Sequence, residues 1–597
     1  MGFVNSFAFM VITFIAFTVL VAIIAYYKSR GVNEGNSEGF YLAGRSLPGI
    51  VIAGSLIMTD LSAMQLVGNN GQSVVVGMGV FAAQGLGFSG MVLAAFMLIP
   101  KYLECGISTM PEFYELRYDK FTRNLITIVM MVNYIFVMIP SALYAGAQVF
   151  IEIFHFDELF NLTFFQALIV MIILIAIIGS LYAICGGLKA IAVSDSINGV
   201  GMLIGGVMIT FFGVTFLSNT LGGDGSMMDG FTKLFTHDPA MMNAINEAYS
   251  NEPWWPWPAI ITGLTINNLY YWGCDQAIVQ RCFGARSLAH AQKGMIYAGI
   301  LTLITPFFLV LPGIIARFVY PDFNFYDNGD FAFPMLLADV MPQAFLGFFA
   351  ACMFGAVLST FNSFLNSAST IFAINIYKET IKKGDVDDKT VMRIGKYIGV
   401  VIAIVATIEA PFLVNAGGIF TWVNSAIGIF SIPILVLTIL AVYSKRVPRY
   451  IGKIIIPLHI IAYSLVTFIL PNFIDFFGQV FYMYWYVFFF LLDMLIAWLL
   501  IKFKPLEEDF VLKKNPPEGM DMSPWKYRKH AVVFTLVCTF LVYVVFSPLC
   551  LGKSDQTTWE RYQEYLNNQS ETTQEVEADA PAANEVSVDG TTYEANL

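Results

Sequence analysis

The chain has 597 residues, of which 57% are hydrophobic and 13% charged, and its formal net charge is −11. A soluble globular protein does not need so many apolar residues, so the composition excludes that class and indicates a helical protein embedded in a lipid bilayer. The basic residues do not form a continuous patch, and we therefore expect no nucleic-acid partner.

Fourteen apolar segments are long enough to cross a membrane as helices, which takes about 20 residues each. The segments are residues 6–27, 48–69, 74–100, 120–152, 162–182, 189–217, 257–276, 288–318, 345–377, 390–409, 417–443, 450–471, 479–503 and 529–549. The first is not typical of a cleaved signal peptide, because no basic residue precedes it and it ends in "YYKSR". The pattern predicts an all-α polytopic membrane protein.

The positions of the basic residues test this number of spans. If the N-terminus faces outside, all but four of the 32 lysines and arginines fall in cytoplasmic loops and their flanks. The four exceptions are Lys233, Arg317, Lys553 and Arg561. A wrong number of spans would mix the two sides, so the positive-inside rule supports fourteen spans. It also predicts that both termini lie outside a plasma or bacterial inner membrane.

The spans divide the chain into six parts. They are a first helix and cytoplasmic loop (1–47), helices 2–6 (48–217), an outer loop (218–256), helices 7–11 (257–443), three peripheral helices (444–551) and an acidic tail (552–597). We expect the polar tail to be disordered. Spans 2 and 7 lie five helices apart and are both interrupted by polar residues, which predicts two inverted five-helix repeats, each beginning with a broken helix.

Polar side chains gather in three spans. "LIMTDLSAMQLVGNNG" (56–71) contains Asp60 and Gln65, "GLTINNLYYWGCDQ" (263–276) contains two asparagines, and "GAVLSTFNSFLNSAST" (355–370) is rich in hydroxyls and amides. Close helix packing explains single Ser, Thr and Gly residues, but Asn, Gln and Asp do not assist it. Since intramembrane polar groups usually line a path for a solute or an ion, the cluster indicates transport.

We expect no enzymatic activity. The seven cysteines form no CxxC pair, and the five histidines have no catalytic or metal-ligating partner nearby in the sequence. "GLGFSG" (85–90) matches the GxGxxG dinucleotide fingerprint, but it lies inside a predicted membrane helix rather than between a strand and a helix. Close packing of helices is therefore the better explanation of these glycines.

Several motifs resemble those of the sodium/solute symporter family, in the order found in that family. They are "GFYLAGRSLPG" (39–49), "LYAICGGLKAIAVSDSING" (181–199), "YYWGCDQAIVQR" (270–281), "LVLPGI" (309–314) and "SFLNSASTIFAINIY" (363–377). The third motif and the fourteen spans are most similar to the sodium–glucose cotransporter branch. The resemblance covers about residues 35–450. It implies a leucine-transporter-like inverted-repeat fold and Na⁺-driven uptake of a small solute by alternating access.

The resemblance also implies where Na⁺ binds. The family's conserved sodium site matches Met58, Leu61, Ala356, Ser359 and Thr360, where Thr360 replaces the commoner serine. Such a set offers hard oxygen ligands with little formal charge, which suits an ion that must leave again.

Some family members have a second sodium site. It matches Asp195, Asn362 and Ser363, together with Ser359. Asn362 stands where a hydroxyl residue is usual, and Asp195 is alternatively a structural hydrogen-bond acceptor.

The solute site resembles the family's sugar site in part. Gln65, Asn268 and Tyr271 match sugar contacts, and Tyr271 matches the tyrosine that closes the inner gate. Departures occur where sugar transporters carry glutamate, lysine and glutamine, and the residues at those positions are Gln84, Thr302 and Asn424. Because an amide offers both a donor and an acceptor, these residues suit a neutral polyhydroxylated solute such as a sugar.

Two further residues of the polar cluster are candidates. Asn267 adjoins Asn268, and Asp60 stands where the family commonly has asparagine. Asp60 could strengthen ion binding, take up a proton or face a donor on the solute. The alternative solutes are a sugar acid, a cyclitol, an amino acid or a vitamin, and the alternative outside transport is a transporter-like membrane sensor.

Overall fold

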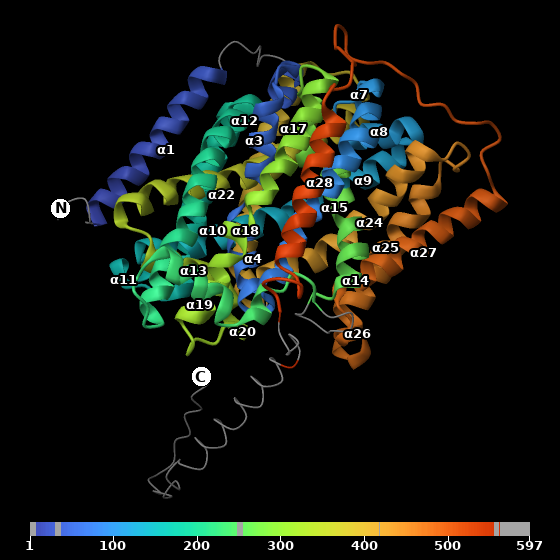
Figure 1. The fold of residues 1–597 in the computed structure, drawn as a ribbon. Coiled ribbons are helices and arrows are strands. Elements are labelled where there is room, and N and C mark those ends of the chain that lie inside the picture. The colour runs from blue at the N-terminus through green and yellow to red at the C-terminus, as the bar shows by residue number, and fades with distance from the viewer. Residues whose placement is uncertain (1–6, 30–36, 247–254, 417, 554–559, 561–597) are drawn as a thin grey trace, which may run out of the picture.

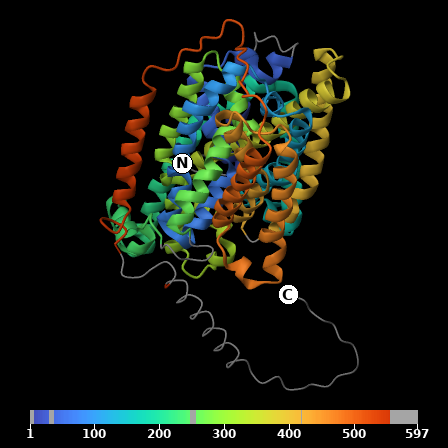
Figure 2. The same ribbon diagram turned by 90° about the vertical axis from the view of Figure 1, so that its right-hand side faces the viewer.

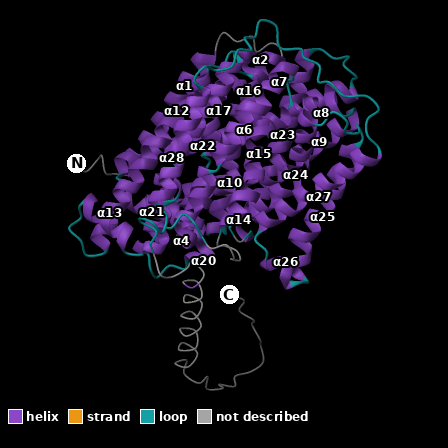
Figure 3. Ribbon diagram, turned by 45° about the vertical axis from the view of Figure 1, so that its right-hand side comes forward, coloured by secondary structure: helices purple, strands orange, loops and turns teal. Residues whose placement is uncertain are grey.

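The structure is a computed structural model that describes residues 7–29, 37–246, 255–416, 418–553 and 560. Almost all of the predicted acidic tail, residues 552–597, lies outside the described residues. Apart from two isolated bridges, the regular elements of the described residues are helices (Figure 3). They form one bundle, with α1 (Phe7–Ser29) at one edge and α25 (Ile451–Ser464) and α27 (Tyr482–Phe503) at the opposite edge (Figure 1).

Eleven helices of the described residues are long and apolar enough to span a membrane, and up to 13 spans result if each of two bent pairs counts as one. The eleven are Phe7–Lys28, Gly87–Cys105, Lys120–Phe154, Phe164–Leu181, Leu188–Thr220, Phe345–Ile381, Asp388–Val414, Ile419–Tyr443, Ile451–Asn472, Tyr482–Phe503 and Arg528–Val545. Phe164–Leu181 and Leu188–Thr220 both belong to the long helix α12 (Phe164–Thr220). The last helix, α28 (Arg528–Val545), lies along the outer side of the bundle and contacts α17 (Figure 2).

The first bent pair is the predicted broken helix. α3 (Gly49–Asp60) and α4 (Ala63–Val76) meet at an angle of 54°. Leu61, at φ −74° and ψ 57°, leaves the helical conformation, and the hydroxyl of Ser62 accepts from the N–H of Gln65 at 3.3 Å to begin α4. The break therefore comes from a capping residue inside an apolar segment.

The predicted boundary between spans 2 and 3, at residues 69–74, is wrong. α4 continues through these residues to Val76, and the protein itself provides partners for Asn70, which lies between the two predicted spans. Asn70 donates to the carbonyls of Leu66 at 2.7 Å and Phe308 at 2.9 Å. Both bonds lie inside the protein, so an asparagine is tolerated in the middle of a buried helix.

The second bent pair was not predicted, since residues 288–318 were expected to form one span. Leu288–Ile304 and Pro306–Val319 meet at 56°. Pro312 lacks the N–H that would reach the carbonyl of Phe308, which frees that carbonyl for Asn70. The proline and the asparagine, far apart in the sequence, thus complement each other across two helices.

The second repeat also begins with an interrupted helix. The segment comprises α14 (Trp257–Ala259), a π-turn and α15 (Thr265–Cys274), and after Asp275 it continues as α16 (Gln276–Phe283). Asp275 is extended and accepts hydrogen bonds from the N–H of Ala277 at 2.8 Å and the hydroxyl of Tyr134 at 3.1 Å. Its role is to cap α16. Because α15 contains two asparagines, the predicted span 257–276 is less apolar than the eleven candidate spans given above.

The remaining core helices surround these breaks. α22 (Gln343–Ile371) packs against α1, α12 and α10 (Ile139–Phe154). α15 packs against α6 (Gly87–Leu93) and α24 (Ile419–Tyr443), while α17 (Leu288–Leu301) packs against α3. The breaks in the two first helices of the predicted repeats are thereby enclosed by protein rather than lipid, as irregular backbone at membrane depth requires.

Candidate solute and sodium site

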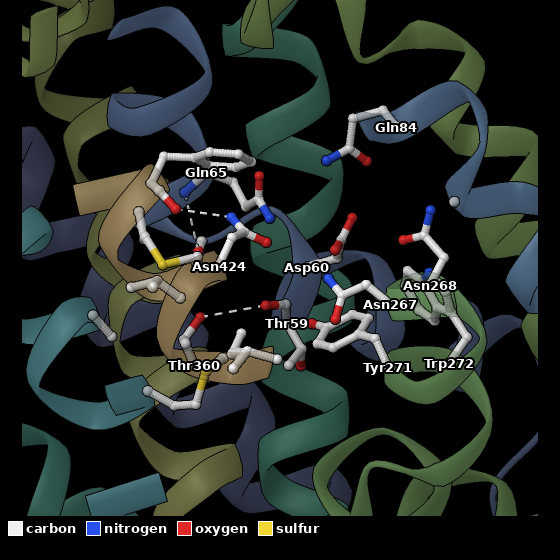
Figure 4. Close-up of a pocket in the computed structure, with 18 of the residues that line it drawn as sticks. Thr59, Asp60, Gln65, Gln84, Asn267, Asn268, Tyr271, Trp272, Thr360 and Asn424 are labelled. Atoms are coloured by element: carbon white, nitrogen blue, oxygen red, sulfur yellow. Dashed lines mark hydrogen bonds between the residues drawn. The ribbon is translucent and has the colours of Figure 1, made fainter. Parts of the chain in front are cut away.

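A cavity of about 70 Å³ lies beside the break between α3 and α4 (Figure 4). Its walls come from α3, α4, α5 (Phe81–Gly85), α15, α22 and α24. Eight of the sixteen predicted solute and ion residues line it, namely Asp60, Gln65, Gln84, Asn267, Asn268, Tyr271, Thr360 and Asn424. Residues from both predicted repeats therefore converge on one polar pocket.

Three polar atoms of this pocket are buried without a hydrogen-bond partner among the described residues. They are Oδ2 of Asp60, Oδ1 of Asn267 and Nδ2 of Asn268. An unpaired buried polar group costs about 1–3 kcal/mol, so such groups in proteins generally serve a ligand or water. The set combines two acceptors with one donor. Hydroxyl groups, which donate and accept, complement this combination.

In two further amide side chains, one polar atom forms a hydrogen bond within the protein. Oε1 of Gln65 accepts from Nδ2 of Asn69 at 2.5 Å, which leaves the Gln65 amino group as the free donor. Nδ2 of Asn424 donates to the carbonyl of Phe420 at 2.8 Å, which leaves its Oδ1 as an acceptor (Figure 4). These bonds orient both side chains at the edge of the cavity before a solute binds.

The charge of the pocket limits which solutes it suits. Among the described residues that line the cavity, Asp60 carries a carboxylate and none is Lys, Arg or His. An anionic solute would meet this carboxylate without a compensating cation, at a large cost in a buried place. The pocket therefore favours a neutral solute, or one that carries a positive charge.

Aromatic rings complete the wall. Tyr271 is half-buried, and its ring lies edge-on to that of Trp272, with 5.0 Å between the centroids. Trp272 and Phe420 line the cavity although sequence reasoning did not select them as site residues. Trp272 could have been found, because it follows Tyr271 directly in the motif that carries the family resemblance.

Thr302 is not among the residues that line the cavity. It is buried elsewhere, and its hydroxyl donates to the carbonyl of Gly299 at 2.7 Å within its own helix. Asp275, part of the polar cluster in the sequence, also lies outside the cavity because it caps α16. A match to a site position of the family thus did not by itself predict that a residue lines this pocket.

One glycine of "GLGFSG", Gly90, packs two helices together. A Cβ atom at Gly90 would lie 2.6 Å from the carbonyl oxygen of Asn268, so α6 and α15 can approach this closely at glycine alone. The packing interpretation is therefore confirmed for Gly90. It also positions the pocket, because the backbone of Asn268 rests directly on α6.

The break in α3 exposes the carbonyls predicted to bind sodium. The N–H of Ser62, which would reach Met58 in a continuous helix, donates to the carbonyl of Asp60 at 2.7 Å. The N–H of Gln65 donates to the Ser62 hydroxyl rather than to the carbonyl of Leu61. The carbonyls of Met58 and Leu61 thereby lose their usual helical partners.

Opposite this break, α22 presents oxygen atoms. The hydroxyl of Thr360 lies 3.1 Å from the carbonyl of Ala356 and 3.5 Å from that of Thr59. The hydroxyl of Ser359 is buried without a partner among the described residues. The described residues contain no group of three or more His, Cys, Asp or Glu side chains that could hold a metal ion. Carbonyl and hydroxyl oxygens of this kind fit Na⁺ rather than a transition metal.

The residues of the possible second sodium site are divided. Asp195, Ser359 and Asn362 line a neighbouring cavity of about 360 Å³, and both amide atoms of Asn362 are buried without a partner among the described residues. Ser363 does not line this cavity and forms a hydrogen bond with Arg281 instead. Sequence reasoning gave no role to Arg281.

Comparison with known proteins identifies the family. The model of the family described as "Sodium:solute symporter family" matches residues 40–451. The chain belongs to this family. Its similarity extends beyond the matched region, because the Escherichia coli (strain K12) protein named "Uncharacterized symporter YidK" is 36% identical, covering 89% of this chain and 90% of that protein. The Vibrio parahaemolyticus "Sodium/glucose cotransporter" is 30% identical, covering 79% of this chain and 88% of that protein.

A solved structure supports the fold. The structure of a Na⁺-coupled sialic acid symporter superimposes with a TM-score of 0.69 at 20% identity, covering 83% of this chain and 98% of that one. At this identity the likeness shows the fold alone. The predicted all-α fold with a leucine-transporter-like core is confirmed. The symporter is a multi-pass membrane transporter rather than an enzyme, and sodium is its coupling ion.

Proposed function

We propose that this symporter imports a small neutral polyhydroxylated solute, a sugar or a related polyol, together with Na⁺ by alternating access. The observation that carries the proposal is the set of unpartnered polar atoms on Asp60, Asn267 and Asn268 in a pocket without a basic residue among its described lining. Hydroxyl groups of a neutral solute satisfy such donors and acceptors without adding charge.

The remaining roles follow from the same pocket. Gln65, Gln84 and Asn424 supply further hydrogen bonds to the solute, and Tyr271 covers one of its faces. The sodium ligands are the carbonyls of Met58, Leu61 and Ala356 and the hydroxyls of Ser359 and Thr360. They adjoin the solute pocket, because Thr360 lines it as well. A shared wall of this kind lets the ion and the solute stabilise the same arrangement of α3 and α22.

The pocket has to widen around its solute. A volume of about 70 Å³ holds roughly five water molecules at about 10–15 Å³ of probe-occupied space each, and a hexose is larger. Alternating access supplies this movement, with residues 48–217 and 257–443 as the two inverted repeats. We further propose that both termini face outside. α1 and α28 run in opposite directions, in agreement with the fourteen predicted crossings (Figure 1).

Uptake into proteoliposomes tests the proposal. The purified full chain is reconstituted, and uptake of a labelled panel is measured with an inward Na⁺ gradient and with K⁺ in its place. The panel contains neutral hexoses, cyclitols, a sugar acid and amino acids. We expect Na⁺-stimulated uptake of a neutral member. Preference for the sugar acid or an amino acid over every neutral polyol would reject the solute class, and uptake unaffected by Na⁺ would reject the coupling.

A mutation connects the uptake with the pocket. Thr302→Val serves as the control, because Thr302 is buried like the pocket residues but does not line the cavity. The Gln65→Ala and Asn267→Ala variants should lose affinity for the transported solute, while Thr302→Val should keep it. Equal affinities in all three variants would place the solute elsewhere.

A further inference from the structure

Arg281 is a buried cation that the solute and sodium sites do not account for. It lies on α16, just beyond the break at Asp275, and is 1% exposed. It does not line the solute cavity. A guanidinium inside a protein requires partners for its donors and a compensating negative charge, so its surroundings explain why it is tolerated there.

The guanidinium is surrounded by oxygen atoms from two other helices and its own. Nε donates to the hydroxyl of Ser55 at 2.7 Å, and Nη2 donates to the hydroxyl of Thr59 at 2.6 Å. Nη2 also donates to the hydroxyl of Ser363, and Nη1 donates to the carbonyl of Ala277. One side chain therefore connects α16 to α3 and α22 through buried hydrogen bonds.

Asp195, from α12, supplies the negative charge. Its Oδ2 lies 3.7 Å from Nη2 of Arg281, and the hydroxyl of Ser55 bridges the two groups by donating to the same oxygen at 2.7 Å. Asp195 is also 1% exposed, so the pair is a buried and neutral unit. Arg281 therefore approaches two oxygen groups of the possible second sodium site. These are the carboxylate of Asp195 and the hydroxyl of Ser363.

The guanidinium thus occupies the oxygen cage that a second cation would use. Two like charges within about 4 Å repel strongly at the effective dielectric of a protein interior. A sodium ion at Asp195 would leave a net positive charge in a buried place while Arg281 stays. The ion can bind there when the guanidinium withdraws from Asp195.

A space beside this cage can admit an ion. The cavity of about 360 Å³ reaches Asp195 next to Ser359 and Asn362. The amide of Asn362 has no partner for its oxygen or its nitrogen among the described residues. An ion that enters here meets a carboxylate, a hydroxyl and an amide oxygen, all of which are suitable ligands for a hard cation.

We propose that Arg281 is a tethered cation that competes with sodium for Asp195 and Ser363. The guanidinium holds both groups when the second ion is absent, and binding of the ion displaces it. The proposal rests on the sodium coupling of the proposed function and on the possible second sodium site. Displacement would release α16 from α3 and α22, and α15, which carries Asn268 and Tyr271, is joined to α16 at Asp275. Arg281 is in this sense a positioning residue that connects ion binding with the solute pocket.

Equilibrium binding of ²²Na⁺ to the purified full chain in detergent measures this competition without transport. Arg281→Gln removes the charge but keeps a donor, and we expect the weaker of the sodium sites to gain roughly tenfold or more in affinity. The double variant Arg281→Gln, Asp195→Asn should lose that gain. Arg123→Gln is the matched control, because Arg123 is also 1% exposed and paired with a carboxylate, that of Glu115, away from both cavities. It should bind sodium like the wild type.

Ser55→Ala tests the same idea if Arg281→Gln does not fold. Alanine fits a helix, and the substitution removes the hydroxyl that bridges Arg281 and Asp195. Sodium affinity should again rise, by a smaller factor, because the guanidinium is held less firmly. Unchanged or weaker sodium binding in Ser55→Ala and in any folded Arg281→Gln overturns the competition. If the wild type shows no sodium-dependent uptake, the proposed function is refuted instead.

Discussion

The substitution Asn268→Ala tests whether Asn268 binds the solute or stabilises the fold. Asn268 is 8% exposed, and its Nδ2 has no partner among the described residues. Its backbone is fixed separately, because its carbonyl rests on Gly90. In the empty transporter the substitution removes no hydrogen bond of this nitrogen. We therefore expect the melting temperature without solute to stay within a few degrees of the wild type or to rise.

The loss should become visible when the solute binds. A neutral hydrogen bond contributes about 0.5–1.5 kcal/mol, and leaving the solute's hydroxyl unpaired in the pocket raises the loss to about 3 kcal/mol. At about 1.4 kcal/mol per factor of ten, the Kd should rise roughly twofold to 150-fold. The sodium ligands lie on α3 and α22 rather than on α15, so the sodium affinity measured without solute should change little.

Isothermal titration of the transported solute at saturating Na⁺ measures this effect. Asn133→Ala is the matched control, because Asn133 is 1% exposed and both of its amide atoms are unpartnered among the described residues, yet it does not line the cavity. Its solute Kd should match the wild type. Equal solute affinity in Asn268→Ala and the wild type, or the same loss in both variants, would refute the assignment of Asn268 to the solute.

Three further variants test the pocket and its support. Ser359→Ala combined with Thr360→Ala removes two hydroxyl ligands, so uptake should lose its activation by Na⁺ while the protein still folds; an unchanged Na⁺ titration of uptake would contradict the ion site. Tyr271→Phe should raise the solute Kd by less than about threefold, because the ring still covers the solute and one hydroxyl is lost; a calorimetric loss as large as that of Asn268→Ala would contradict this role. Gly90→Ala places a Cβ atom 2.6 Å from a backbone oxygen and should lower stability by about 1–3 kcal/mol, measured as a lower melting temperature. Gly87→Ala is its control, because the nearest atom there is 3.7 Å away and the melting temperature should change less.

The membrane spans and the first helix break could be predicted from the sequence because both depend on adjacent residues. Apolar length decides which segments enter the bilayer, and a capping serine at position 62 ends one helix and starts another within a few residues. The amide residues of the pocket were also found by sequence reasoning. Asn and Gln are costly inside a membrane, so Asn267, Asn268 and Gln65 stand out among apolar neighbours.

The partner of each buried polar group was decided by tertiary structure alone. Asn70 falls between two predicted spans, but in the structure it lies inside a helix beside the carbonyl of Phe308, which a distant proline frees. Thr302 has a family position that suggested the solute site, but its hydroxyl turns to its own helix. Arg281 meets Asp195 only because α16 and α12 both pack against α3. Hydrophobicity and capping act along the chain, whereas the pairing of buried charges and amides depends on how helices far apart in sequence pack together.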